Sequence, residues 1–369
     1  MQVSGVYSNN PLGLDDPERK GMCTTGNLEL SDLTPILFGH AAFQYLNAGC
    51  ELGLFQLLQQ HSDLTKEEIR QRIGLAERAA DILLLGSTSL RLTVSESGHY
   101  RNAPVIDQLF EDGQWEAFTN IVAFEAWIVY EGQADFVESL RQNTNVGLRR
   151  VRGVGRDLYH RLQENPVMEG IFYQYMRSWS ETSNPLLIKW GGFSTVKQVL
   201  DVGGGDAVNA IALAQAHPHL EITIMEISAT GPIARKRVED SGLGERIRVH
   251  ECDMFADKFP VGADCVLFAH QLVIWTPEQN IQLLRRAYEA LPDGGQIVIF
   301  NSMSSDHGDG PLMAALDSVY FASLPAEGGM IYPWRQYEEW LREAGFQHEG
   351  IQRICGSSWT PHGLLTATK

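Results

Sequence analysis

The sequence contains few cysteines and no long apolar run. Five cysteines occur among 369 residues, at wide spacings and without a Cys-x-x-Cys pair. Neither a disulfide framework nor a structural zinc site fits that pattern, so we expect reduced thiols and no metal. No run of about 18 apolar residues could cross a membrane, and the N-terminus has no apolar signal core. We therefore expect a cytoplasmic protein.

Positive charge is also scarce. Lys and Arg number 29 against 46 Asp and Glu, which gives a formal net charge of -17. A chain this acidic repels the phosphate backbone of nucleic acids and anionic lipid surfaces. Nucleic acid and membrane are therefore disfavoured as partners.

Three parts follow from the pattern along the chain. Residues 1–30 are rich in Asn, Gly, Pro and charge and are interpreted as a mobile arm, either a disordered leader or an arm that crosses to a partner subunit. Residues 31–185 are expected to form a helical domain, to which the family resemblance described below assigns dimerisation and closure over the substrate. Residues 186–369 are expected to form a ligand-binding α/β domain.

The helical part begins with a winged-helix outline. Apolar residues recur at helical spacing over 33–60, and Thr65 with Glu68 has the spacing of a capping box. Residues 92–102 predict a hairpin that turns at Ser97-Gly98. DNA binding would need a basic recognition helix, whereas these helices are acidic or apolar. Dimerisation is therefore the favoured role.

Residues 105–185 predict helix throughout, with two aromatic stripes. Such stripes belong more often to a core than to a pocket, although Tyr and Trp favour sites with one polar end. The stripes consist of Phe124, Trp127 and Tyr130, and of Phe172, Tyr175, Met176 and Trp179.

From about Val196, short β-branched runs alternate with helical stretches. The runs are VKQVLDVG, LEITIMEI, IRVHECDM, ADCVLFAH and GQIVIFNSM. Alternation of this kind predicts an α/β fold, with a parallel sheet covered by helices on both faces.

The strongest motif is the loop after the first of these strands. Asp201 is followed by Gly203-Gly204-Gly205 and then by a helix. Glycines permit a tight turn and close approach of a ligand to the backbone, and ligands bind at the carboxyl ends of strands in open α/β sheets. Val208 breaks the dinucleotide fingerprint, and Asp201 and Asp206 add negative charge. The loop therefore suits a cationic ligand better than a pyrophosphate.

The next two strands also end in acids. Glu226 ends the second strand, where it could bond ribose hydroxyls. Asp253-Met254 ends the third, where an acid and an apolar residue suit the amine and the face of an adenine. Either acid alone could be a solvated loop residue, but three acids at successive strand ends favour an adenosine ligand.

In these motifs the chain resembles the small-molecule O-methyltransferases of plant and bacterial secondary metabolism. The resemblance rests on VLDVGGG, MEI, CDMF, DCVLFAHQLVIW, LPDGGQIVI and WLREAGF, and covers roughly residues 33–369. It implies a class I methyltransferase (Rossmann-like) sheet, a winged-helix-like dimerisation domain, a homodimer and S-adenosyl-L-methionine (SAM) as methyl donor. The residues that would hold SAM are Met176, Asp201, Gly203, Gly205, Glu226, Asp253 and Met254, with Met176 near the sulfonium.

The chain departs from the family at the catalytic base. Where the family has Leu-His-Asp-Trp, this sequence reads Leu272-Val273-Ile274-Trp275, and the acid that orients the His is replaced by Asn301. Valine cannot accept a proton. Three hypotheses remain: methylation of a nucleophile that needs no strong base, a different base, or SAM binding without methyl transfer.

His270 is the best substitute base, because it lies three residues before Val273 and imidazole titrates near neutrality. Alternatively it packs against SAM. Asp317 and Tyr320 are further catalytic candidates, since they lie where the family lines its acceptor pocket, although each could be structural.

The leading hypothesis is C-methylation of a small aromatic acceptor, a phenol-type metabolite or an aromatic amino acid, in secondary-metabolite or antibiotic biosynthesis. A ring carbon can attack the methyl group without the usual His base. The alternatives are O- or N-methylation by proximity, a reaction of the decarboxylase, hydroxylase or pericyclase type, and a non-enzymatic regulator that reads SAM.

Overall fold

The computed structural model describes residues 28–356 and 359–369. The chain divides into a unit that ends at His40 and a second unit from Ala41 to Lys369. The predicted arm over 1–30 lies almost entirely outside the described residues. In the first unit, η1 (Leu30–Leu33) begins with a capping box between Glu29 and Asp32.

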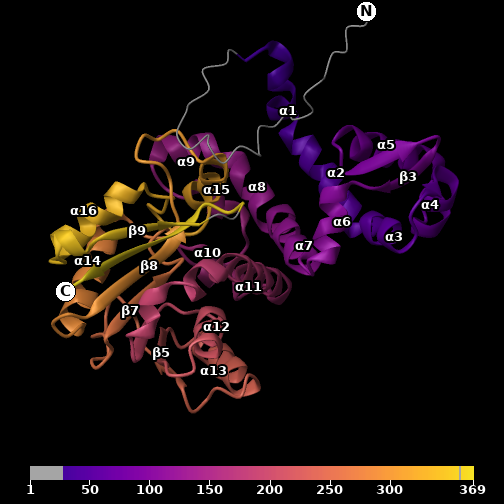
Figure 1. The fold of residues 1–369 in the computed structure, drawn as a ribbon. Helices are drawn as coiled ribbons and strands as arrows, with labels where there is room; N and C mark the ends of the chain where they lie inside the picture. Colours follow the sequence, from indigo (N-terminus) through magenta and orange to yellow (C-terminus); the bar gives the residue numbers. More distant parts are fainter. Residues whose placement is uncertain (1–27, 357–358) are drawn as a thin grey trace, which may run out of the picture. The chain divides into compact units, whose positions relative to one another are not determined.

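Helices make up most of the N-terminal half, and Figure 1 shows their order. The α-helices are α1 (Thr34–Leu37), α2 (Gly39–Glu51), α3 (Leu54–Gln60), α4 (Lys66–Ile73), α5 (Glu77–Ser89), α6 (Pro104–Glu111), α7 (Trp115–Phe124), α8 (Tyr130–Gly132), α9 (Phe136–Gln142), α10 (Leu158–Leu162), α11 (Pro166–Ile188), α12 (Val208–Ala216), α13 (Gly231–Asp240), α14 (Pro277–Ala290), α15 (Leu312–Ser323) and α16 (Trp334–Ala344). Short 3-10 helices are η3 (Gln133–Asp135), η4 (Val146–Arg150), η5 (Gly191–Ser194) and η6 (His348–Gly350), and η2 (Glu125–Val129) is a π-helix.

The strands form two sheets, of three and seven strands. The small sheet contains β1 (Leu64–Thr65), β2 (Thr93–Glu96) and β3 (His99–Asn102). The large sheet contains β4 (Gln198–Val202), β5 (Glu221–Glu226), β6 (Ile247–Glu251), β7 (Cys265–Ala269), β8 (Gln296–Ser302), β9 (Gln352–Cys355) and β10 (His362–Thr368).

The winged-helix outline is confirmed. Antiparallel β2 and β3 form the predicted hairpin, and Ser97 and Gly98 turn it with positive φ. The Thr65 hydroxyl accepts from the Glu68 backbone N–H at the start of α4, and the Glu68 carboxylate accepts from the Thr65 backbone N–H. This reciprocal capping box satisfies two donors that the helix itself leaves unpaired.

The π-helix η2 divides the first aromatic stripe. Phe124 is buried, but Trp127 is 55% exposed. Three-residue spacing places side chains on one face only while the turn holds about 3.6 residues, and a π-turn widens it. The prediction of helix throughout 105–185 is also wrong over 143–157, where η4 is the one helical segment.

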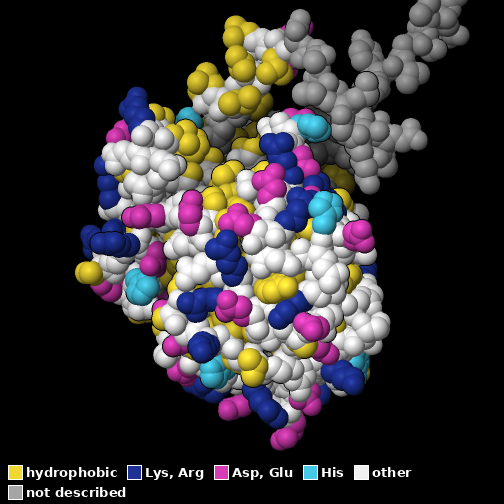
Figure 2. Space-filling view, turned by 90° about the vertical axis from the view of Figure 1, so that its left-hand side faces the viewer, with side chains coloured by type: hydrophobic (Ala, Val, Ile, Leu, Met, Phe, Trp, Pro, Cys, Tyr) yellow, Lys and Arg dark blue, Asp and Glu magenta, His cyan; other side chains and the backbone are white. Residues whose placement is uncertain are grey.

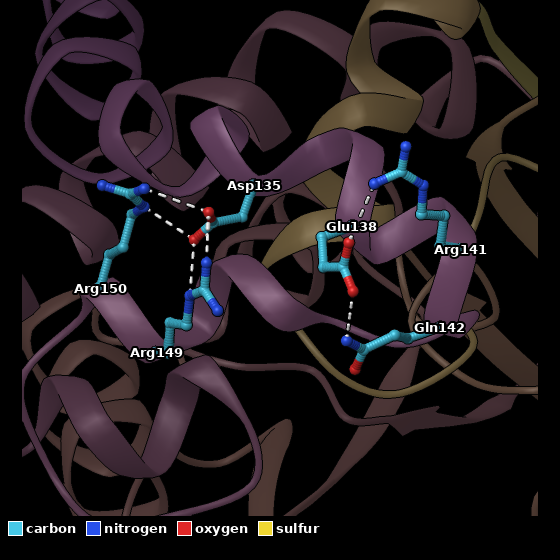
Figure 3. A network of polar contacts seen from close by, with 6 residues as sticks. All are labelled: Asp135, Glu138, Arg141, Gln142, Arg149 and Arg150. Atoms are coloured by element: carbon cyan, nitrogen blue, oxygen red, sulfur yellow. Dashed lines mark hydrogen bonds and ion pairs between the residues drawn. The ribbon is translucent and has the colours of Figure 1, made fainter.

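Asp135 fixes this irregular region through two arginines (Figure 3). Its carboxylate accepts from the Nε atoms of Arg149 and Arg150 at 2.9 and 2.7 Å. The two guanidinium groups hold the pKa of Asp135 well below its usual range. The neighbouring Glu138 carboxylate accepts from Arg141 and Gln142. Asp135 thus ties η4 to η3, whereas the bonds of Glu138 stay within α9.

The large sheet has the order β6-β5-β4-β7-β8-β10-β9. Strands β4 to β8 pair in parallel, and β10 runs antiparallel between β8 and β9. The predicted class I α/β fold is confirmed. The sequence interpretation did not include β9 and β10, because their register depends on pairing with the distant β8.

Helices cover both faces of this sheet (Figure 1). Helices α12 and α13 and the end of α11 pack on one face, where Leu187, Leu213 and Val238 are buried. Helices α14 and α16 pack on the other, around Leu284, Tyr337 and Leu341. Because both faces are covered, the strand ends are left as the place where the sheet meets a ligand.

Acidic and basic side chains are interspersed over the face shown in Figure 2.

Within the described residues, no helix has the length and apolar character needed to cross a membrane.

Candidate functional site

The site lies where the strand order reverses, between β4 and β7. The loops that leave these two strands diverge to opposite sides at such a point, which leaves a crevice at the carboxyl edge of the sheet. The glycine loop follows β4, and the segment that begins at His270 follows β7.

The glycine loop turns in a conformation that needs glycine. Gly203 and Gly205 have φ of 69° and 57°, a region that side chains rarely adopt. A Cβ at Gly203 would lie 2.4 Å from the side-chain Cδ of Gln271, whose amide donates to the Gly203 carbonyl at 2.9 Å. The loop is therefore fixed against the segment after β7 with its backbone open to the crevice.

Glu226 at the end of β5 is bound to the same loop. One carboxylate oxygen accepts from the Gly205 N–H at 2.9 Å, and the other from the Ile227 N–H at 2.9 Å. Burial raises the pKa of Glu226, while the two backbone donors act in the opposite direction. Each oxygen has further lone pairs that can accept from a ligand.

Asp201 lies beneath the loop and is fully buried. Neither of its carboxylate oxygens has a hydrogen-bond partner among the described residues. Burial, with a smaller contribution from Glu226, raises the pKa of Asp201 to about 7. Unpartnered buried acids are costly, so this carboxyl is the kind of orphan that a cationic ligand would stabilise.

Asp206 does not supply the free negative charge that the sequence suggested. Its carboxylate forms ion pairs with Arg177 of α11, at 3.3 Å, and with Arg237 of α13. It therefore joins α11 and α13 to the loop, and its charge is largely neutralised.

Asp253 lies at the rim of the crevice, after β6. One carboxylate oxygen caps the Phe255 N–H at 2.7 Å, which leaves the other oxygen for a ligand donor. Met254 beside it is partly buried. Phe255 packs edge-on against Trp275, with ring centroids 4.9 Å apart.

These elements enclose a cavity of about 350 Å³. Six of the seven residues predicted to hold SAM line it, whereas Asp201 lies behind its wall. The six are Met176, Gly203, Gly205, Glu226, Asp253 and Met254. The cavity suits SAM. The backbone of the glycine loop is open to it, the carboxylates of Glu226 and Asp253 can accept hydrogen bonds, and the lining is mostly acidic and apolar.

His270 also lines this cavity. Its φ is 59°, an unusual conformation for a residue with a side chain, and its backbone N–H donates to the Phe300 carbonyl at 2.8 Å. Burial lowers the pKa of His270 to about 4. The imidazole is therefore neutral at neutral pH, and its Nε2 has no partner among the described residues.

A second buried imidazole lies against His270. The ring of His362 on β10 is 5.0 Å from it, and neither nitrogen of His362 has a described partner. Burial lowers the pKa of His362, and His270 adds to the effect. No pattern in the sequence pointed to His362, because antiparallel pairing of β10 with β8 creates this contact.

The other catalytic candidates, Asp317 and Tyr320, lie outside the cavity lining, as does Val273 at the position of the family's base. Val273 is buried and packs with Ile274 and Ala326. Asp317 and Tyr320 on α15 do not line the cavity. Tyr320 packs in the helical core, with its ring 5.2 Å from that of Phe124.

Sequence reasoning missed several lining residues. Tyr159 and Tyr173 both face the cavity, and burial raises the pKa of each phenol. Tyr159 packs edge-on against Phe172, with ring centroids 5.6 Å apart. Tyr159 lies in the stretch GRDLYH, which corresponds to a substrate-side helix of the family that the sequence resembles, and that resemblance was the available signal.

Comparison with known proteins agrees with this geometry. Residues 130–347 match the O-methyltransferase domain, and residues 35–111 match the O-methyltransferase dimerisation domain.

Relatives cover nearly the whole chain. An L-tyrosine C(3)-methyltransferase of Streptomyces lavendulae is 58% identical over 93% of each chain. A 3-hydroxy-5-methyl-1-naphthoate 3-O-methyltransferase of Streptomyces sahachiroi is 32% identical, over 91% of this chain and 94% of the relative. The crystal structure of the S-adenosylmethionine-dependent methyltransferase SibL in its apo form is 50% identical, with a TM-score of 0.83, over 92% of this chain and 99% of that one. The chain therefore belongs to the O-methyltransferase family, and it is a SAM-dependent methyltransferase.

Proposed function

We propose that this enzyme methylates a ring carbon of a phenolic amino acid of the tyrosine type. The observation that carries the proposal is the 58% identity to an L-tyrosine C(3)-methyltransferase over 93% of both chains. The site supports it, because Val273 is buried away from the cavity, while His270, Tyr159 and Phe172 provide an aromatic wall beside the SAM residues.

We propose the following roles for the SAM residues, and their positions around the cavity support them. Glu226 binds the ribose hydroxyls, Asp253 the adenine amine, and Met254 the adenine face. Gly203 and Gly205 provide close backbone contact, and Asp201 compensates positive charge from behind the loop. Met176 on α11 lies toward the sulfonium.

Bound SAM supplies an electrophilic methyl group. The ring carbon ortho to the phenol hydroxyl provides the electron pair of the new C–C bond, and the pair of the broken C–S bond stays on sulfur. The ring then loses the proton of that carbon. Neutral His270 is the base that we assign: it accepts this ring proton, while the phenol hydroxyl keeps its own proton. Holding the reactants in line supplies much of the rate enhancement.

The test is to incubate the enzyme with methyl-labelled SAM and either L-tyrosine or O-methyl-L-tyrosine. We expect labelled 3-methyltyrosine and one S-adenosylhomocysteine per product, with little reaction of the blocked acceptor. Mass spectrometry locates the label. Label on oxygen or nitrogen would overturn C-methylation, and turnover without S-adenosylhomocysteine would overturn methyl transfer.

SAM affinity is expected to rise with pH between about 6 and 8. In the ligand-free protein, burial holds the pKa of Asp201 near 7, so part of the population is protonated at neutral pH. A cation nearby favours the carboxylate, so binding should release a proton. Calorimetry in buffers of different ionisation enthalpy measures this release. Asp201→Asn should flatten the dependence, and a flat profile for the wild type would contradict the assignment.

We also propose a cytoplasmic homodimer with the three-part division at residues 30 and 185. The match to the dimerisation domain supports dimerisation. Large apolar side chains lie exposed on α9 and α15, namely Val137, Leu140, Leu312 and Leu316. Light scattering of the full chain tests the stoichiometry.

A further inference from the structure

Two carboxylates lie close together in the helical part without a cationic partner. Glu125 belongs to the π-helix η2, and Asp317 to α15. Neither forms an ion pair or hydrogen bond with any residue in 28–356 or 359–369. Burial raises the pKa of each to about 7, and the charge of Asp317 adds to the effect on Glu125.

Two tyrosine hydroxyls face the same place. Tyr175 and Tyr320 are each 5% exposed, yet no described residue forms a hydrogen bond with either hydroxyl. Both phenol groups interact electrostatically with Glu125 and Asp317, and burial with these charges raises the pKa of both. Neither hydroxyl is among the fully enclosed side-chain atoms that lack a partner, so both keep access to space that a ligand group can fill.

The backbone conformation around Glu125 is a π-turn. A π-turn inserts extra backbone into a helix, and such turns occur frequently at functional sites. Here it follows Phe124, whose ring stacks on Tyr175 at 3.7 Å and packs edge-on against Tyr320 at 5.2 Å. Phe124 therefore anchors both tyrosines beside the residue that follows it.

The aromatic cluster connects this group to the SAM cavity. The Phe124 ring lies 6.2 Å from that of Phe172, and Phe172 lines the cavity. An aromatic amino acid whose ring lies beside Phe172 has its amino-acid head at the end remote from the reacting phenol. Tyr159, which lines the cavity, also interacts electrostatically with Tyr175 and Tyr320, so the group of acids and tyrosines adjoins the cavity wall.

Four groups that can accept hydrogen bonds thus converge, without a positive charge among the described residues. A ligand that satisfies them must carry positive charge and several N–H donors. We propose that Glu125 and Asp317 bind the α-ammonium group of the acceptor amino acid, with the hydroxyls of Tyr175 and Tyr320 lining the same subsite. This inference rests on the proposed function, and it gives Asp317 a binding role in place of the catalytic one expected from the sequence.

The test compares two acceptors that differ in the ammonium group. L-Tyrosine and 3-(4-hydroxyphenyl)propanoate share the phenol ring and the carboxylate. We expect the wild type to prefer tyrosine by about 100-fold in kcat/KM, and Glu125→Gln and Asp317→Asn each to lower kcat/KM for tyrosine about 10- to 100-fold, mainly through KM. Activity on the acceptor without ammonium should stay near the wild-type level, so the preference collapses.

Glu116→Gln is the matched control, because Glu116 is an exposed carboxylate on α7, the helix that leads into η2. Equal losses on both acceptors would mean that the pair only maintains the fold and would overturn the proposal. The wild-type preference is measured without any variant, so its absence would overturn the ammonium subsite even if a variant misfolds. Methylation of both acceptors at similar rates would overturn the ammonium subsite but not the proposed function. Methylation of neither acceptor would overturn both.

Discussion

Replacing Glu226 by alanine is expected to weaken SAM binding about 100-fold or more, since two charge-assisted hydrogen bonds to ribose hydroxyls are lost. The same change removes the acceptors of the Gly205 and Ile227 N–H groups, which hold the glycine loop in its open turn. The first effect acts on the bound state, and the second acts on the loop before SAM binds. Isothermal titration calorimetry with SAM measures the loss directly.

Glu221→Ala is the control for Glu226→Ala. Glu221 begins the same strand, β5, and is exposed at the opposite end from the site. Its loss should leave the affinity for SAM unchanged. If Glu226→Ala melted like the wild type and bound SAM within about threefold of it, Glu226 would not be a ribose ligand.

Comparison of the predicted and observed sites shows which features a sequence carries. Asp201, Glu226 and Asp253 were assigned together because they follow or end parallel strands, and the carboxyl ends of such strands lie along one edge. Strand order and register fix that geometry. The structure places Glu226 and Asp253 in the cavity lining and Asp201 just behind it.

Charge compensation was not predictable in the same way. Asp206 was counted as free negative charge, yet it pairs with Arg177 and Arg237, which lie 29 and 31 residues away in the sequence. Those contacts arise from the packing of α11 and α13 around the glycine loop. No spacing of residues in the sequence indicates these ion pairs.

The position of Glu125 was hidden for a different reason. Helical periodicity assumes a constant turn, and the π-helix breaks that assumption at Glu125 itself. The aromatic stripe that begins at Phe124 therefore suggested one continuous face. In the structure Phe124 enters the core and Trp127 turns outward. The π-turn thus separates side chains that a regular helix would place on one face.

Replacing His270 by alanine is expected to lower kcat about 100-fold or more, within the range measured for loss of a general base. The imidazole is neutral at neutral pH because burial lowers the pKa of His270 to about 4, so it can accept the ring proton. Its left-handed backbone conformation, held by the bond to the Phe300 carbonyl, directs the side chain toward the cavity. The measurement is kcat for ring methylation at saturating SAM and acceptor, with SAM affinity measured in parallel.

Whether the substitution changes kcat or the dissociation constant of SAM identifies the role of His270. A base acts on kcat and leaves the dissociation constant of SAM nearly unchanged, whereas a residue that only packs against SAM raises that constant and leaves kcat within about threefold of the wild type. His250→Ala provides the control, because His250 is an exposed histidine on β6, at the edge of the same sheet, and lies outside the cavity lining. If His270→Ala kept its kcat, the base would have to be another group, and Tyr159 on the cavity wall would be the next residue to replace.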